Sequence, residues 1–149
     1  MTIRIARFSG AVVLIAFLLA ACRQQQADTD QPMPQQLPPD FVAFYERFHQ
    51  DSAFQMAHIA FPLEGLPPEV DSATLAAGTF RWTPENWTLH RPFDPDSGFE
   101  RTFVVYNDRM ILEKLVHRNG QLGMARRWAK VGDEWQLIYF AGLNRVQGR

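Results

Sequence analysis

The sequence predicts an α+β domain in which N-terminal helices pack on a curved antiparallel sheet. Two observations indicate this fold class. Apolar residues recur at helical spacing over residues 41–48, and the last third of the chain divides into strand-like segments separated by short turn sequences. Helices followed by consecutive antiparallel strands are typical of α+β domains, in which the sheet covers the apolar face of the helices. We divide the chain into a leader (1–21), a tether (22–39) and this domain (40–149).

The helical part is expected to begin at Asp40, whose side chain can cap the first turn. Phe44 and Phe48 are one turn apart on the apolar face of the first helix, and we expect both to be buried against the sheet. A second, short helix is expected from 51 to about 58. Within it, Gln55 stands just before an apolar strand, where an amide is costly to bury unless both its ends are satisfied. We therefore expect Gln55 to make a buried hydrogen bond and not to touch a ligand.

The middle of the chain is less regular. Residues 59–65 have strand composition, and Pro62 within them suggests an edge strand because proline cannot donate to a neighbour. An excursion over 66–77 precedes a short element at 79–83, and residues 88–90 are expected to begin another short element.

The last third carries the clearest pattern. Its strands are expected at 101–107, 109–118, 123–131 and 134–143. The intervening pairs Asn107-Asp108, Asn119-Gly120 and Gly132-Asp133 are typical of tight turns, the last two of hairpins. Tight turns join antiparallel neighbours, so this part is predicted to be a meander.

Two segments of this domain resemble known families. Phe48, Asp51, Phe54-Gln55, Ile59 and Phe61-Pro62-Leu63 resemble the N-terminal signature of an uncharacterised family of bacterial envelope lipoproteins. The segment 135–139, Trp-Gln-Leu-Ile-Tyr, resembles the last strand of nuclear-transport-factor-two-like domains. The resemblance implies a cone-shaped α+β fold with a pocket between helix and curved sheet. That fold class includes isomerases, dehydratases and noncatalytic binding modules, so it does not select a function.

The leader has the features of a secretory signal. Arg4 and Arg7 precede the apolar run 11–18, which is short for a membrane span. The following Leu19-Ala20-Ala21-Cys22 resembles the lipobox of bacterial lipoprotein precursors, which implies that the Cys22 sulfur receives diacylglycerol and that the chain is cut before it. The alternative is an ordinary signal peptide with an accidental cysteine.

The lipobox resemblance also implies a location. Arg23 stands where an aspartate would favour the inner membrane, so we expect a lipid-anchored protein of the bacterial cell envelope, at the outer membrane and facing the periplasm. Residues 23–39 are polar and proline-rich and contain little to bury, so we expect a disordered tether. Fully extended, it would reach roughly 55–60 Å.

Composition limits the partners of the mature chain. Removing residues 1–21 takes away two arginines and no acid, which leaves 13 basic against 16 acidic residues, net −3. No basic stripe interleaved with aromatic residues is present, so nucleic acid is not an expected partner. Cys22 is the single cysteine of the chain, so a disulfide within the mature chain is not possible. The expected partners are the membrane, through the lipid, and a small apolar molecule or an envelope protein.

An enzyme of isomerase or hydratase type would need an acid or base in the implied pocket. The candidates are Asp51, Tyr106 and Glu113, with His58 and His117 as titrating groups, and we assign none of them a catalytic role. Glu113 and His117 share a strand face that is more typical of a solvated surface, and His58 is more typical of a structural histidine.

No metal or cofactor site is predicted. The four histidines are scattered without the paired spacing of zinc ligands, so we assign neither a metal site nor a cofactor.

Aromatic residues supply the remaining candidates for a binding site. Arg126, Trp128 and Lys130 alternate along one strand and therefore share a face. We select Trp82, Trp87, Arg126 and Trp128 as candidate contacts to a ligand or partner, against the alternative that the tryptophans only fill the core. The sequence thus favours a noncatalytic binding module, with a small pocket enzyme that uses a buried carboxylate as the alternative.

Overall fold

The computed structural model describes residues 36–146 of the chain. The leader, Cys22 and most of the tether lie outside the described residues, and so do residues 147–149. In chain order the elements are α1 (Pro39–Gln50), α2 (Ser52–Ala57), β1 (Ile59–Leu66), α3 (Ser72–Ala77), β2 (Arg81–Trp82), a 3-10 turn η1 (Pro95–Ser97), β3 (Phe99–Asn107), β4 (Met110–His117), β5 (Leu122–Val131) and β6 (Glu134–Arg145).

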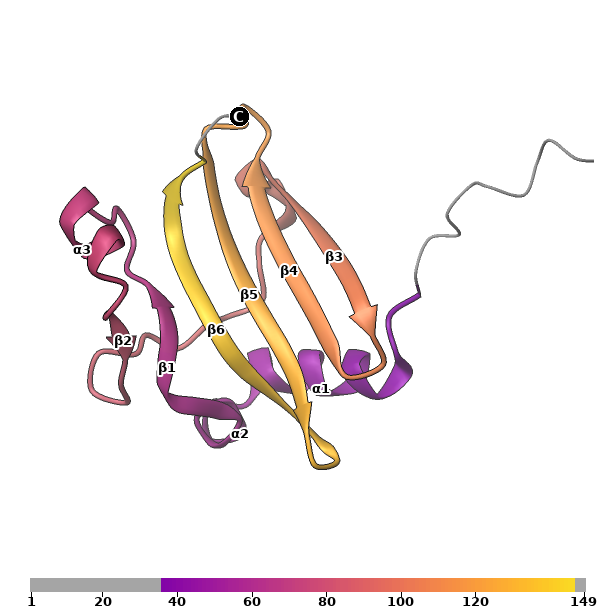
Figure 1. Cartoon of the computed structure of the whole chain (residues 1–149). Coiled ribbons are helices and arrows are strands. Elements are labelled where there is room, and N and C mark those ends of the chain that lie inside the picture. Colours follow the sequence, from indigo (N-terminus) through magenta and orange to yellow (C-terminus); the bar gives the residue numbers. More distant parts are fainter. Residues whose placement is uncertain (1–35, 147–149) are drawn as a thin grey trace, which may run out of the picture. The chain divides into compact units, whose positions relative to one another are not determined.

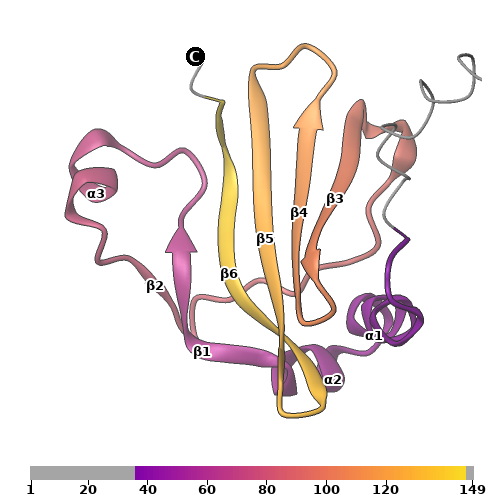
Figure 2. The same ribbon diagram turned by 45° about the vertical axis from the view of Figure 1, so that its right-hand side comes forward.

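The strands form one curved sheet of six strands in the order β2-β1-β6-β5-β4-β3, with α1 across one of its faces (Figures 1 and 2). The predicted α+β fold class is confirmed, and β3 to β6 form the expected antiparallel meander. The sheet is nevertheless mixed, because β1 runs parallel to β6. Tight turns fix the direction only of the strands that they join, and β1 and β6 are far apart in the sequence.

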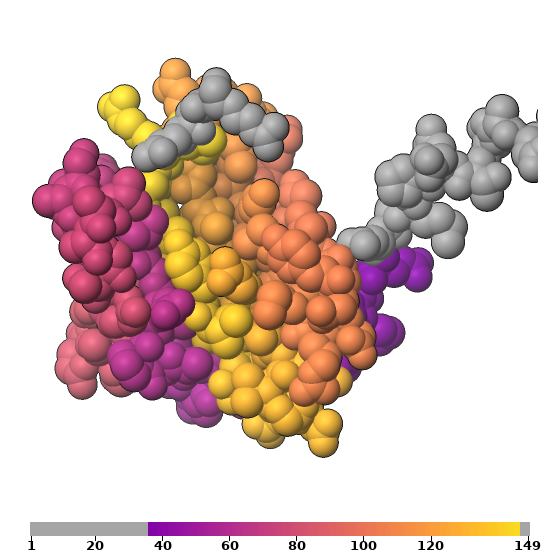
Figure 3. All heavy atoms as spheres, in the orientation of Figure 1, coloured from indigo at the N-terminus to yellow at the C-terminus, as the bar shows by residue number. Residues whose placement is uncertain are grey.

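Both predicted hairpin turns are present. Gly120 and Gly132 adopt positive φ angles of 72° and 63°, which glycine reaches without steric cost. The opposite face of the meander is free of helices in the described residues, as the exposed surface of β4, β5 and β6 in Figure 3 shows.

The first helix begins differently from the prediction. Asp40 is not its cap: α1 starts at Pro39, whose fixed φ suits the first helical position, and no side chain caps the helix. The Asp40 carboxylate instead accepts hydrogen bonds from Lys130 Nζ (2.7 Å) and Trp135 Nε1 (3.0 Å). Leu37, which we assigned to the tether, packs against the core. The folded part therefore begins a few residues before Asp40.

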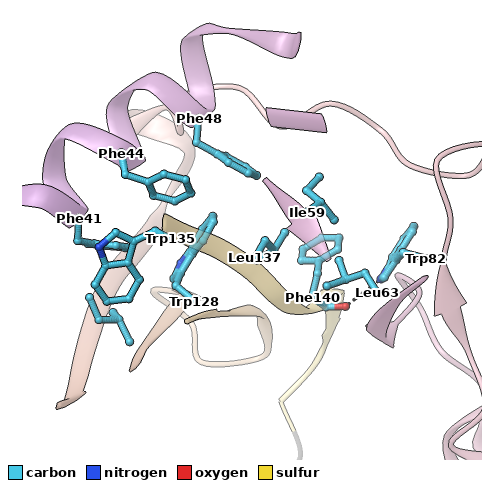
Figure 4. Packing of buried hydrophobic residues seen from close by; sticks show 11 residues of the cluster. Phe41, Phe44, Phe48, Ile59, Leu63, Trp82, Trp128, Trp135, Leu137 and Phe140 are labelled. Atoms are coloured by element: carbon cyan, nitrogen blue, oxygen red, sulfur yellow. Dashed lines mark hydrogen bonds between the residues drawn. The ribbon is translucent and has the colours of Figure 1, made fainter. Parts of the chain in front are cut away.

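The core lies between α1 and the sheet (Figure 4). Three phenylalanines of α1, Phe41, Phe44 and Phe48, pack on Trp128 of β5. Their ring centroids lie 5.0–6.0 Å from the centroid of the Trp128 ring. Phe44 and Phe48 are buried, as predicted. Aromatic rings in edge-to-face contact thus fill the space directly under the helix.

Three smaller predictions in the middle of the chain need correction. β1 is not the edge strand, because the two-residue β2 pairs with it through Leu63 and Glu64 on the side away from β6. The excursion contains α3, which is capped by Asp71. Residues 88–90 form neither helix nor strand. None of the helices in the described part of the chain is long and apolar enough to cross a membrane.

Candidate functional site

A pocket of about 410 Å³ opens beside the aromatic core, on the same face of the sheet. We call it the tryptophan pocket. Its floor comes from β5 and β6, and its walls come from the segment 87–93 and from Trp82 of β2. Its lining residues are Pro68, Trp82, Trp87, Thr88, Leu89, His90, Arg91, Phe93, Met124, Arg126, Phe140, Gly142 and Leu143. Its volume and mostly apolar lining are those of a small-molecule site.

The two tryptophans of the pocket are held by hydrogen bonds. Trp82 Nε1 donates to the backbone oxygen of Phe140 (2.9 Å), and Trp87 Nε1 donates to Gln55 Oε1 (3.2 Å). Their rings meet edge to face, with centroids 5.8 Å apart. With its polar edge occupied, each indole is fixed in orientation.

Gln55 of α2 anchors the wall of the pocket. Its Nε2 donates to the backbone oxygens of Phe48 (2.7 Å) and His90 (2.8 Å), and its Oε1 accepts from the backbone N–H of His90 (2.7 Å) as well as from Trp87. The amide is almost completely buried and makes four hydrogen bonds, the number that an amide can make with two donors and one oxygen. The expected buried hydrogen bond is confirmed, and Gln55 lies outside the pocket lining.

Arg126 of the pocket belongs to a polar group that we call the Glu113 cluster: Tyr45, His49, Arg101, Glu113 and Arg126. Of these, Arg101 is exposed to solvent. Glu113 Oε1 accepts from the Tyr45 hydroxyl (2.6 Å) and lies 3.4 Å from Arg101 Nε. Glu113 Oε2 accepts from Trp128 Nε1 (3.2 Å) and lies 3.6 Å from Arg126 Nε. The carboxylate is fully buried, so the idea that it occupies a solvated face is wrong. Its burial is possible because donors surround both oxygens.

The histidine of the cluster is held neutral. His49 Nδ1 donates to the backbone oxygen of Tyr45 (2.8 Å), which leaves Nε2 to accept from Arg126 Nη1 (2.6 Å). Burial, and then the charge of Arg126, lower the pKa of His49 to about 4. Burial is also the main cause that raises the pKa of Tyr45, followed by the charge of Glu113, so Tyr45 remains a donor. The cluster therefore has two positive charges, on Arg101 and Arg126, against one negative charge on Glu113.

Arg126 connects the cluster to the pocket. It is 2% exposed, yet it belongs to the pocket lining, and its Nε has no hydrogen-bond partner. His90 lines the pocket as well, with its ring between those of Trp87 and Phe140, both at 4.5 Å. Its Nδ1 is buried without a partner, and burial lowers the pKa of His90 to about 3. A buried polar atom without a partner costs about 1–3 kcal/mol, so both nitrogens call for an explanation.

A second hollow is larger but less suited to binding. It has a volume of about 690 Å³ and lies between α3 and the ends of β5 and β6. Its side chains include Glu69, Ser72 and Arg145, and the amide of Asn144 is already bonded to the backbone of Pro67, Val70 and Gly142. Neither of the unpartnered buried nitrogens found among residues 36–146 belongs to it. We therefore take the tryptophan pocket as the candidate site.

The structure brings three of the four predicted contact residues together. Trp82, Trp87 and Arg126 line the tryptophan pocket, whereas Trp128 is fully buried under α1 and outside the lining. Arg126 and Trp128 share a strand face as expected, but α1 covers the part of that face that carries Trp128. The pocket implied between helix and sheet thus lies beside α1, because aromatic side chains fill the space beneath it.

The candidate acids and histidines of the enzyme hypothesis do not meet in one place. Asp51 caps α2 by accepting from the N–H of Phe54 (2.9 Å), and Tyr106 is exposed. His58 stacks on Phe54 at 3.8 Å, and His117 lies by the turn after β4, where its Nδ1 faces the N–H of Asn119 at 3.3 Å. None of these residues, nor Glu113, lines the tryptophan pocket.

Sequence reasoning missed several residues of the site, among them His90, Phe93, Met124 and Phe140. It also missed the pairing of Glu113 with Arg126, for which a signal existed. Both residues are six positions from the predicted turn at Asn119-Gly120, so a hairpin places them opposite each other. Within residues 36–146, no group of three or more histidine, aspartate or glutamate side chains is arranged to hold a metal ion.

No protein-family model and no curated protein matches the sequence. Solved structures similar to this chain include three from Bacteroides. A cystatin-like protein from Bacteroides caccae ATCC 43185 is 18% identical and has a TM-score of 0.52, with 74% of this chain and 79% of that chain covered. A protein from Bacteroides ovatus ATCC 8483 is 18% identical over 74% and 77% of the two chains, with a TM-score of 0.48. An NTF2-like protein from Bacteroides fragilis NCTC 9343 is 16% identical over 74% and 50%, with a TM-score of 0.39.

Similarity at these identities concerns the fold and not the function. The lipoprotein family that the sequence resembles stays a prediction, since its leader lies outside the described residues. The residues that the structure describes form an α+β domain of helices on a curved mixed sheet, a fold that is similar to that of the cystatin-like protein.

Proposed function

We propose that this protein is a lipid-anchored envelope protein that binds a small apolar molecule in the tryptophan pocket without transforming it. The observation that carries the proposal is the pocket itself. Two fixed indoles, Met124 and Phe140 present apolar surface around about 410 Å³, and α1 leaves this part of the sheet uncovered. Exposed apolar surface of this kind gains free energy when a ligand removes it from water.

The enzyme alternative finds less support in the same geometry. It needs a carboxylate that is free to exchange a proton with a bound substrate. The buried carboxylate of the described domain, Glu113, is surrounded by Tyr45, Arg101, Arg126 and Trp128. Such an arrangement holds the cluster together and leaves the carboxylate without access to the pocket, so we do not propose catalysis.

Binding can be tested by titrating the full chain with decanol and following tryptophan fluorescence, since Trp82 and Trp87 line the pocket. Leu89→Asp places a charge on the pocket wall and should weaken binding at least about tenfold, because the charge must be desolvated when the probe enters. Leu75→Asp is the matched control: Leu75 and Leu89 are 41% and 37% exposed, and Leu75 lies in α3. Equal affinities for Leu89→Asp and the parent, or weaker binding only in Leu75→Asp, would contradict the proposed site.

The anchor is supported by the sequence alone, through Leu19-Ala20-Ala21-Cys22. Cys22→Ala removes the sulfur that would carry the lipid, and one or more buried acyl chains contribute about 0.8 kcal/mol per methylene to membrane binding. We expect the variant to leave the membrane fraction and to incorporate no labelled fatty acid. If the variant sediments with membranes as fully as the parent, and the parent takes up no label, the protein is not anchored through Cys22.

A further inference from the structure

We infer that the ligand of the tryptophan pocket is a carboxylate with an apolar body, and that Arg126 binds its head. This inference rests on the proposed function and adds the chemical class of the ligand. It follows from the charges around the pocket, from the hydrogen-bonding capacity that the protein leaves unused there, and from the distribution of apolar surface.

The charges favour an anion. Two arginines line the pocket, the buried Arg126 and the exposed Arg91, and no acidic residue of the described chain does. Glu113, the acid of the cluster, is shared between Arg101 and Arg126, while His49 and His90 are held neutral by burial. Arg101 is exposed to solvent and the buried Arg126 has Glu113 as its counter-ion, so the charges that the pocket itself presents are those of Arg126 and Arg91. A ligand in this pocket meets two guanidinium groups and no carboxylate, which favours an anionic head.

The unused hydrogen-bonding capacity favours an oxygen acceptor. Arg126 donates from Nη1 to His49, whereas its Nε lies 3.6 Å from Glu113 Oε2 and makes no hydrogen bond. His90 Nδ1 also has no partner and belongs to the same pocket, and it donates to an oxygen when the proton of the neutral ring is on Nδ1. These two are the buried side-chain nitrogens without a partner among residues 36–146. A carboxylate has two charged acceptor oxygens. It therefore forms stronger hydrogen bonds with a guanidinium than a neutral hydroxyl group forms.

The apolar surface favours a ligand with an extended hydrophobic part. Trp82, Trp87, Met124 and Phe140 surround the space next to Arg126. On β5 Met124 and Arg126 are alternate residues, so they face the pocket side by side. A molecule with its head on Arg126 therefore has its body against Met124 and the indole rings. A cation would meet two arginines, and a neutral molecule would lack the charged oxygen that a guanidinium binds most strongly.

The test compares three probes of equal chain length on the full chain at pH 7: decanoate, decanol and decyltrimethylammonium. Each is titrated below its micelle-forming concentration, with tryptophan fluorescence and calorimetry as readouts. We expect decanoate to bind at least about tenfold more tightly than decanol, which is what one hydrogen bond to a charged group supplies, and the ammonium probe to bind most weakly. This comparison needs no variant.

Two variants test whether Arg126 causes the preference for decanoate over decanol. Arg126→Met is made together with Glu113→Gln, because removing both members of a buried ion pair leaves no uncompensated charge. In this double variant the preference for decanoate over decanol should fall to about threefold or less. Arg127→Met is the matched control, since Arg127 lies on the opposite face against Tyr139 and its loss should leave the preference unchanged.

The outcomes separate this inference from the proposed function. Binding of none of the three probes would overturn both. Decanol binding as tightly as decanoate would overturn the inference and leave the apolar pocket standing. A preference for decanoate that survives in the double variant, or that is lost in Arg127→Met, would overturn the role of Arg126.

Discussion

Gln55 links the stability of the domain to the shape of the pocket, and Gln55→Leu tests that link. The substitution keeps the size of the side chain and removes all four of its hydrogen bonds. The groups that lose their partner are the backbone oxygen of Phe48, the backbone N–H and oxygen of His90, and Trp87 Nε1. Three of these four groups belong to the wall of the tryptophan pocket.

The expected loss of stability in Gln55→Leu follows from the four hydrogen bonds that the variant lacks. Each contributes about 0.5–1.5 kcal/mol net, and leucine regains part of the loss because it is apolar, so we expect the free energy of unfolding to fall by about 2–5 kcal/mol. Native domains are stable by about 5–15 kcal/mol, so the loss should be large but measurable. We also expect weaker binding of decanol, because the segment that carries Trp87 and His90 is no longer tied to α2. Gln55 does not line the pocket, so this effect would be transmitted through its bonds to Trp87 and His90.

Urea unfolding of the full chain, followed by circular dichroism, measures the effect. Gln121→Leu is the matched control, because Gln121 is exposed in the turn between β4 and β5 and its replacement should change stability by no more than about 0.5 kcal/mol. A midpoint for Gln55→Leu within error of the parent would show that the buried amide does not stabilise the domain. An unchanged affinity for decanol would show that it does not shape the pocket.

Three further predictions follow from the core and the Glu113 cluster. Phe48→Ala should cost about 3–5 kcal/mol in urea unfolding, because the fully buried ring leaves a cavity against the sheet, and a midpoint equal to that of the parent would refute the packing of α1 on the sheet. Glu113→Gln should cost about 3–5 kcal/mol because it leaves Arg126 buried without its carboxylate, and a loss below 1 kcal/mol would mean that the pair is dispensable. Stability should decrease as the pH falls from about 6.5 toward 4, since the unfolded chain takes up protons at His49 and His90 that the folded chain, with pKa values of about 4 and 3, does not. His49→Gln should flatten this dependence, and an identical pH profile in the variant would contradict it.

Much of the fold could be predicted because it depends on local patterns. The spacing of Phe44 and Phe48 predicted the buried face of α1, and the turns at Asn119-Gly120 and Gly132-Asp133 predicted the hairpins. The partner of β1 could not be predicted in the same way. Its pairing with β6 joins strands that are separated by most of the domain, and no turn between them fixes their direction.

The candidate site was predicted only in part, for a physical reason that lies in β6. An irregularity opposite Arg127 and Trp128 shifts the register, so that Phe140 and not Tyr139 follows Leu137 on the buried face. A prediction that assigns every second residue of β6 to the buried face is therefore wrong for the residues after Leu137. Another missed residue, His90, lies at the pocket because Gln55 holds its backbone. That contact joins α2 to a loop 35 residues away, and a repeating pattern of apolar residues does not predict such a contact.

The most direct test of the account is to observe where an apolar molecule lies on the protein. Intermolecular nuclear Overhauser effects between decanol and the isotope-labelled full chain would identify the side chains that it touches. We expect contacts to the indole rings of Trp82 and Trp87 and to the methyl group of Met124, with none to Ile138 or Tyr139 on the opposite face of the sheet. Contacts confined to that opposite face, or no saturable binding at all, would contradict the proposal that the tryptophan pocket is a binding site.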